Sequence, residues 1–216
     1  MDAGEQLAGH LRDYAGEAPI VLGIPRGGVP VAARVARHLG APLDVCVVRR
    51  LHAAGPLKLG IGAVAEGGAV FLDRRMLHLT GPRNAEVAQQ IRRERAKVED
   101  LAERFRDGQP PPVLQDRTVI LVDDGIALGE TVQAALRCLR RQQPRRIVLA
   151  VPVAASESLE PLEPRVDALV CLHRDPALCS LGQWFEDFAP ISDGEVLGLL
   201  GAHRAPRREA RLQLLA

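Results

Sequence analysis

The sequence predicts a single-domain α/β fold in which a central parallel sheet is flanked by helices. Short apolar runs alternate with helical patterns along most of the chain, which is the signature of β-α-β units. Several of these runs are uncharged and rich in β-branched residues, as expected of strands that are covered on both faces. With 216 residues, the chain is long enough to bury one large core.

The strand candidates follow one another at the spacing of crossover units. Residues 119–122 (VILV) and 147–151 (IVLAV) are the clearest buried strands, and residues 130–141 between them form a helical pattern. Further strands are predicted at 20–24, 43–48 and 168–172, and a further helix at 29–39, which Gly40 ends. Because parallel strands joined by helices make right-handed crossovers, this order predicts one open sheet.

Two segments interrupt the alternation and predict a flap over about residues 61–108. Residues 61–73 (IGAVAEGGAVFLD) have the pattern of a hairpin that turns at 66–68, and residues 84–106 that of a long amphipathic helix. The flap belongs to a domain predicted over residues 1–204, and residues 205–216 are expected to be a short C-terminal tail. The amphipathic flap could help a homodimer to form.

Composition and charge argue against several classes of protein. The formal net charge is +1, whereas a nucleic-acid-binding protein needs a basic surplus, so nucleic acid is not expected as a partner. No apolar stretch approaches the roughly 20 residues that span a bilayer, and the acidic start MDAGEQLAGHLRDY does not resemble a secretory signal. The four cysteines include no C-x-x-C pair and are expected to be buried thiols of a cytoplasmic protein.

The most informative segment is residues 119–131 (VILVDDGIALGET). An apolar strand delivers two adjacent carboxylates, Asp123 and Asp124, to its C-terminal edge, and a turn of small residues leads into a helix. Carboxylates can accept hydrogen bonds from sugar hydroxyls, and the free amides of a helix start can hold a phosphate. The segment therefore predicts a site for a phosphorylated sugar. The alternative interpretation is a strand–turn–helix unit with two solvated aspartates.

This segment resembles the phosphoribosyl-pyrophosphate (PRPP) binding signature of the type I phosphoribosyltransferases, in which two acids end an apolar strand and a Thr-Gly-x-Thr-like turn follows. Three other stretches resemble motifs of that family in the expected order. They are residues 23–28 (GIPRGG, its pyrophosphate loop), 47–50 (VVRR, the start of its mobile loop) and 182–188 (GQWFEDF, the acceptor-side segment of bacterial members). The similarity extends from about residue 20 to residue 195 and implies the fold of this family.

The resemblance implies transfer of ribose 5-phosphate from PRPP to a planar, nitrogenous acceptor with release of pyrophosphate. Positive charge would develop on the ribose ring, which suits acids, and negative charge on the leaving group, which suits amides and arginines. Mg²⁺ is the implied cofactor; it would arrive on the pyrophosphate oxygens, and the two aspartates would hold its waters. The family also implies a cis peptide bond near Pro25–Arg26.

The implied site residues form four groups. The catalytic group is Asp123, Asp124 and Arg26; the 5′-phosphate group is Ala127, Leu128, Gly129, Glu130 and Thr131; the pyrophosphate group is Arg26, Gly27, Gly28, Arg49, Arg50 and Lys58; and the acceptor group is Trp184, Phe185 and Glu66. Each arginine alone could equally be an exposed surface charge. Trp184 could stack on the acceptor or form a lid over the core, and Glu66, like Glu186, could orient the acceptor or simply be solvated.

Two departures from the family pattern keep a second hypothesis open. Leu128 stands where the family has a small hydroxyl residue, and the expected lid, residues 51–59, is poor in polar side chains. The alternative function is therefore a non-catalytic regulator of the same fold that binds PRPP or a nucleotide.

Overall fold

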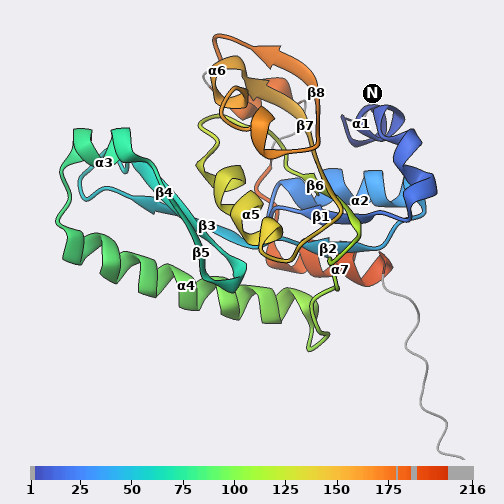
Figure 1. Ribbon diagram of the computed structural model, residues 1–216, viewed down its shortest axis with the longest axis horizontal. Coiled ribbons are helices and arrows are strands. Elements are labelled where there is room, and N and C mark those ends of the chain that lie inside the picture. Colours follow the sequence, from blue (N-terminus) through green and yellow to red (C-terminus); the bar gives the residue numbers. More distant parts are fainter. Residues whose placement is uncertain (1–2, 179, 186–188, 204–216) are drawn as a thin grey trace, which may run out of the picture.

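The computed structural model describes residues 3–178, 180–185 and 189–203. Its central sheet has five parallel strands in the order β2-β1-β6-β7-β8 (Figure 1). The strands are β1 Ile20–Gly23, β2 Leu43–Val45, β6 Thr118–Val122, β7 Arg146–Ala155 and β8 Ala168–Asp175. All five lie within or overlap the predicted runs, so the expected fold class, with one parallel sheet flanked by helices, is confirmed.

The helices predicted at 29–39, 84–106 and 130–141 are present, and four helices that the sequence patterns did not predict accompany them. In chain order, the helices are α1 Ala3–His10, α2 Gly28–Leu39, α3 Arg74–Thr80, α4 Asn84–Arg106, α5 Glu130–Arg140, α6 Ser156–Leu159 and α7 Asp193–His203. Short 3-10 turns occupy Arg12–Glu17, Glu66–Gly68, Glu163–Arg165 and Leu181–Trp184. The sequence patterns did not predict α7. The predicted tail, residues 205–216, lies outside the described residues.

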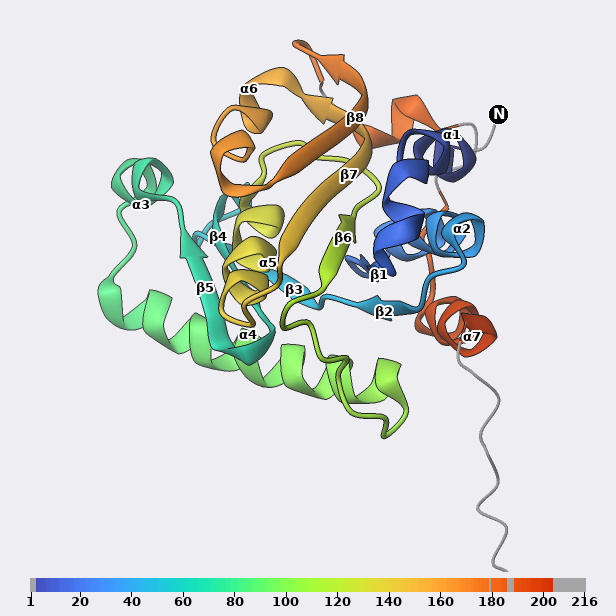
Figure 2. The ribbon, with the colours of Figure 1, turned by 45° about the vertical axis from the view of Figure 1, so that its right-hand side comes forward.

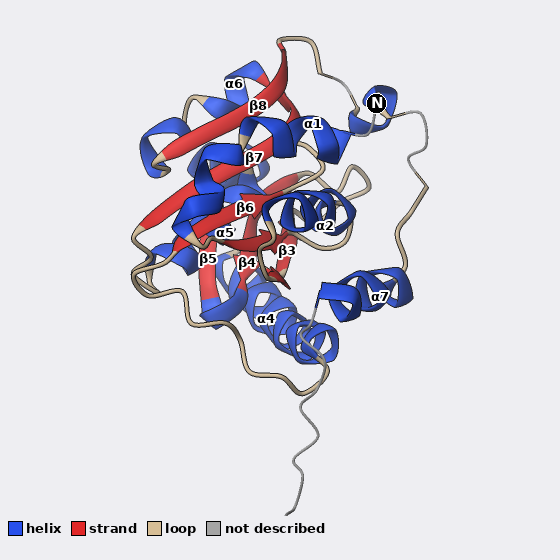
Figure 3. Cartoon of the chain, turned by 90° about the vertical axis from the view of Figure 1, so that its right-hand side faces the viewer, coloured by secondary structure: helices blue, strands red, loops and turns tan. Residues whose placement is uncertain are grey.

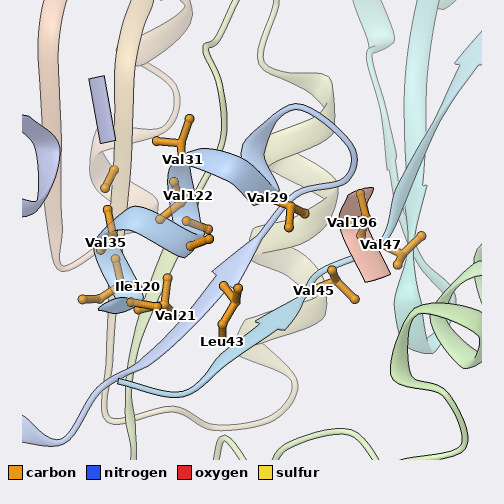
Figure 4. Close-up of a cluster of buried hydrophobic side chains, with 14 of the residues drawn as sticks. Val21, Val29, Val31, Val35, Leu43, Val45, Val47, Ile120, Val122 and Val196 are labelled. Carbon is orange, nitrogen blue, oxygen red and sulfur yellow. The ribbon is translucent and has the colours of Figure 1, made fainter. Parts of the chain in front are cut away.

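Alternate side chains of the parallel strands pack into two apolar clusters, one on each face of the sheet. In β6, Ile120 and Val122 join the cluster that includes side chains of α1, α2 and α7 (Figure 4). Val119 and Leu121 join the cluster on the other face, to which α5 contributes. Helices therefore cover the sheet on both sides, with α1 and α2 on one side and α5 on the other (Figure 2). This arrangement explains why the middle strands β1 and β6 are almost entirely apolar.

A second, antiparallel sheet extends to one side of the parallel sheet (Figure 1). Its strands are β3 Val48–His52, β4 Gly60–Ala65 and β5 Ala69–Leu72, and α4 runs along it. The predicted hairpin is present as β4 and β5. The predicted strand at 43–48 is wrong in extent, because the chain leaves the parallel sheet after Val45 and starts β3 at Val48. The antiparallel layer therefore begins before residue 61, where the flap was expected to start.

Arg106, at the end of α4, holds the two layers together. Its guanidinium pairs with Asp44 of β2 at 3.1 Å and with Glu66 at 2.7 Å, and it donates to the carbonyl oxygen of Val45. Burial alone would lower the pKa of Arg106, but the carboxylates of Glu66 and Asp44 more than offset this and raise it. Glu66 also accepts a hydrogen bond from the amide of Val47. These contacts fix the point where the chain passes from one sheet to the other.

None of the helices in the described part of the chain is both long enough and apolar enough to cross a membrane.

We expect Arg106→Ala to lower the free energy of unfolding by about 3 kcal/mol or more, because it leaves the carboxylates of Asp44 and Glu66 half-buried without a cation. Arg92→Ala, an exposed change on the same helix, is the control and should shift it by no more than about 0.5 kcal/mol. Urea unfolding followed by circular dichroism measures both. Equal, small effects of the two changes would show that the Arg106 network does not hold the layers together.

Candidate functional site

Strand β6 delivers Asp123 and Asp124 to the carboxyl edge of the parallel sheet, where open α/β sheets bind ligands. All five residues of β6 are buried, and the strand ends directly before the two acids. The Asp123 side chain is itself buried, and its Oδ1 accepts a hydrogen bond from the amide of Asp124 at 3.0 Å. Asp124 is half-buried. The alternative of two solvated aspartates is therefore wrong for Asp123.

The environment of the two carboxylates opposes their ionisation. Burial raises the pKa of Asp123 well above its ordinary value, and the neighbouring charge of Asp124 raises it further. Burial also raises the pKa of Asp124. The positive charge of Arg50 partly opposes the shift in both. Carboxylates whose pKa is raised by burial and by a neighbouring charge, at a sheet edge, are candidate functional residues.

The loop between β1 and α2 lies directly against these acids. It contains a cis peptide bond between Pro25 and Arg26, as the family resemblance implied. A Cβ on Gly27 would overlap Oδ2 of Asp124, and a Cβ on Gly28 would lie 2.8 Å from the carbonyl oxygen of Val122. Glycine is therefore required at Gly28 for the loop to approach the backbone of β6, whereas a side chain at Gly27 would displace the Asp124 carboxylate.

The turn after the acids is held by backbone contacts to neighbouring strands and helices. Ile126 pairs with β7, since its amide donates to the carbonyl of Val153 at 3.0 Å. The carbonyl of Ala127 accepts a hydrogen bond from Ser158 Oγ, and Gly129 has a φ of +83°, a conformation that favours glycine. The side chain of Leu128 is 66% exposed. Helix α5 starts at Glu130, so its first amides open at this turn.

Of the two arginines on β3, only Arg50 reaches this turn. Its Nε donates to Thr131 Oγ1 at 3.2 Å. The carboxylate of Glu130 is buried beside the start of β4, where a Cβ on Gly60 would lie 2.5 Å from Oε1. Burial raises the pKa of Glu130, and the charge of Arg50 opposes that shift. Glu130 thus places a further buried acid at the edge of the expected phosphate turn.

Two predicted site residues, Arg49 and Glu66, are placed elsewhere, and the expectations for them need correction. Arg49 lies on the opposite face of β3 from Arg50, because side chains alternate along a strand, and it pairs with Glu94 of α4 at 2.5 Å. Lys58 is exposed in the loop between β3 and β4, where the lid was expected, so its role toward pyrophosphate stays a prediction. The carboxylate of Glu66 is bound by Arg106 and by the amide of Val47, so it is not available to an acceptor.

A cavity of about 490 Å³ adjoins Asp124. Its polar lining comes from Arg26 and Asp124, and its apolar lining includes Val31, Phe185 and Ile191. Phe185 is thus placed where an acceptor was expected. Trp184 is not among the lining residues; it is 40% exposed and stacks on His173, with ring centroids 5.2 Å apart.

The structure adds one residue to this region that sequence reasoning missed, Asp193. Its Oδ1 accepts a hydrogen bond from Nε of Arg26 at 2.6 Å. The motif Ser192-x-x-Glu195 is a capping-box pattern and would have indicated a helix starting at this point. The partnership with Arg26 joins residues 167 positions apart and has no local sequence signal. Glu186 and Phe188, also considered for the acceptor side, lie outside the described residues.

The residues present fit a divalent cation that arrives with its ligand. Two adjacent carboxylates lie at the end of β6, and a cation would oppose the burial and the like charge that raise the pKa of Asp123. Over the described ranges, no group of three or more His, Cys, Asp or Glu side chains could hold a metal ion by itself. The arrangement suits a hydrated ion whose other ligands come from a phosphate group.

Comparison with known proteins is consistent with these features. The family model described as the phosphoribosyl transferase domain matches residues 1–175. A protein of Mycobacterium tuberculosis (strain H37Rv) with the name "Putative phosphoribosyl transferase" is 39% identical over 204 residues, which are 94% of this chain and 46% of that protein. The chain thus spans about half the length of the curated relatives it matches, a second strain's copy included.

Among solved structures, the protein TT1426 from Thermus thermophilus is similar over nearly the whole chain. The TM-score is 0.77 at 38% sequence identity, and the match covers 94% of this chain and 96% of that one. The family match extends over the β1 loop, β3, the paired acids and β7, which are the elements that build the site. The chain therefore belongs to the phosphoribosyl transferase domain family.

Proposed function

We propose that this chain transfers ribose 5-phosphate from PRPP to a planar, nitrogenous acceptor, with release of pyrophosphate and in dependence on Mg²⁺. The observation that carries the proposal is the convergence of three elements at one sheet edge. The paired acids Asp123 and Asp124 lie against the loop of Gly27, and Arg50 reaches the turn that follows them. The adjacent cavity lined by Phe185 offers space for an acceptor.

The charges of the site match those of the proposed reaction. The bond from the anomeric carbon to a pyrophosphate oxygen breaks, a bond from that carbon to the acceptor nitrogen forms, and this nitrogen releases its proton to solvent. During the transfer the ribose ring becomes positive and the leaving group negative. Asp123 and Asp124 would lie beneath the ring and stabilise its charge. Arg26 and the amides of the 24–28 loop would hold pyrophosphate, and the turn at 127–131 would hold the 5′-phosphate.

Mg²⁺ bound to pyrophosphate would neutralise part of the charge on the leaving group. Asp123 and Asp124 would hold the ion through its waters, which fits two acids whose ionisation is opposed when they are alone. Because Leu128 is largely exposed, its side chain does not fill the turn, and the backbone amides remain available to a phosphate.

Incubation with PRPP and Mg²⁺ against a panel of purines, pyrimidines and other nitrogenous rings tests the proposal. Release of pyrophosphate that depends on one acceptor supports it. Binding of PRPP in calorimetry, without release of pyrophosphate for any acceptor, would favour the non-catalytic regulator instead. Absence of PRPP binding would exclude both functions.

We expect Asp124→Asn to lower turnover more than tenfold and to raise the melting temperature at pH 7–8. The pKa of this acid is higher in the folded chain than its ordinary value of 3.8, so its ionisation costs folding stability above that value. The gain should disappear below about pH 4, where the carboxyl is neutral in both states. In a chain of this size, a gain of 1 kcal/mol in the free energy of unfolding raises the melting temperature by about 2–4 °C.

Differential scanning calorimetry across pH measures this effect. Asp100→Asn, an exposed change on α4, is the matched control and should change neither turnover nor its pH dependence. A lower melting temperature for Asp124→Asn at pH 8 would contradict the unfavourable burial of this carboxylate. Wild-type turnover by the Asp124→Asn variant would show that Asp124 has no role in the reaction.

We expect Gly27→Ala to weaken PRPP binding at least tenfold, because the new Cβ would displace the Asp124 carboxylate or the loop that contacts it. Gly9→Ala is the control, since a Cβ there meets nothing within 4 Å. Calorimetric titration measures affinity, and denaturant unfolding measures stability. The stability loss of Gly27→Ala should shrink when Asp124 is also replaced by Ala, since the two residues are in contact. Additive losses would show that they do not interact.

A further inference from the structure

Arg26 is held in place by a residue that belongs to a different part of the chain. Its Nε donates to Oδ1 of Asp193 at 2.6 Å, and Oδ2 of the same carboxylate accepts a hydrogen bond from Nη1 of Arg104 at 3.0 Å. The hydrogen bond from Arg26 and the charges of both arginines lower the pKa of Asp193, so it is ionised at neutral pH. One carboxylate thus joins the 24–28 loop, α7 and α4.

Asp193 is the first residue of α7, and this helix is fixed by a capping motif at its start and by apolar packing along one side. Ser192 and Glu195 cap α7: the Ser192 amide donates to Glu195 Oε2 at 2.8 Å, and the Glu195 amide donates to Ser192 Oγ. Val196 and Leu200 are buried in the apolar cluster shared with α2. Helix α7 lies beside α2 and α4 (Figure 3). The Asp193 carboxylate is therefore not needed for capping and is presented from a fixed helix.

The geometry of the contact leaves the outer part of the guanidinium to a ligand. A guanidinium has five N–H donors in a rigid plane, and binding through Nε fixes the orientation of that plane. Asp193 uses Nε, and its contact does not occupy the two Nη groups of Arg26. Arg26 also lines the cavity beside Asp124, so these donors lie at the edge of the proposed site.

Stability alone does not account for this contact. The side chains of Arg26, Asp193 and Arg104 are 52%, 26% and 57% exposed. Ion pairs with this exposure add little to folding free energy, because water screens them and two long side chains lose rotamer freedom. The contact instead favours ligand binding. An Arg26 side chain that is already ordered loses less conformational entropy when a ligand binds.

We infer that Asp193 is a positioning residue that orients Arg26 toward the pyrophosphate group of the substrate. The inference rests on the proposed function, since it assigns Arg26 to that group. Residues 189–191, which lead into α7, line the cavity together with Arg26. Asp193 therefore ties the pyrophosphate loop to the wall of the cavity in which the acceptor would bind.

Calorimetric titrations with Mg²⁺-pyrophosphate and, separately, with ribose 5-phosphate test this role. Asp193→Ala should weaken pyrophosphate binding about five- to tenfold and leave ribose 5-phosphate binding unchanged, because the latter does not use Arg26. Asp193→Asn retains an oxygen that can accept from Nε and should restore most of the affinity. Arg104→Met removes only the outer partner of Asp193 and serves as the control, with both affinities close to wild type.

If Asp193→Ala weakens the binding of both ligands equally, the role of Asp193 is merely structural, and if it weakens neither, Asp193 has no role. Both results overturn the inference.

The ¹⁵N–¹H signal of Arg26 Nε provides a readout that needs no ligand. It should be protected from exchange in the wild type and in Arg104→Met, and lose protection in Asp193→Ala. Failure of the wild type to bind either ligand would refute the proposed function and, with it, the role toward pyrophosphate, whereas a protected Nε signal would still establish the contact. Binding of ribose 5-phosphate alone would overturn only this inference.

Discussion

The site depends on holding two adjacent carboxylates together, one of them buried. Burial and the neighbouring like charge both oppose ionisation of Asp123. The packing of the apolar strand β6 between the two apolar clusters offsets this unfavourable free energy. The chain can keep such a pair only because the fold around β6 is firmly packed. The loop between β1 and α2 can lie directly against the acids because Gly27 and Gly28 have no side chains. A ligand that supplies sugar hydroxyls and a cation would relieve the repulsion, so binding energy is concentrated at this point.

The antiparallel sheet contributes to the site of the paired acids through one face of β3. Side chains alternate along β3, so Arg50 points to the turn after the acids while Arg49 pairs with Glu94 on α4. The second arginine therefore does not double the positive charge of the site; it secures the long helix to the strand. Arg106 secures the same helix at its other end through Asp44 and Glu66. Arg49, which was expected to bind pyrophosphate, and Glu66, which was expected to contact the acceptor, instead connect the layers.

The parallel strands and the paired acids could be predicted because their signals are local: apolar β-branched runs, then charge, then a turn of small residues. The same reasoning could not place Arg49 or Glu66. Their roles depend on which face of β3 is turned inward and on where the chain leaves the parallel sheet after Val45, and tertiary pairing decides both. Phe185 and Trp184 are adjacent in sequence, yet one lines the cavity and the other stacks on His173. The contact of Asp193 with Arg26 is likewise set by the packing of α7 and not by any motif.

The distribution of charge across the site explains how an acidic centre can suit an anionic substrate. Negative charge is concentrated at the end of β6, in Asp123 and Asp124, whereas the cations come from the two sides: Arg26 from the loop after β1, and Arg50 from β3. In the proposed reaction, positive charge develops on the ribose at the centre, and negative charge stays on phosphate groups at the periphery. A site with acids in the middle and guanidinium groups at its edges is therefore complementary to the transition state. Since Asp193 orients one of these guanidinium groups in advance, part of this complementarity is built before any ligand binds.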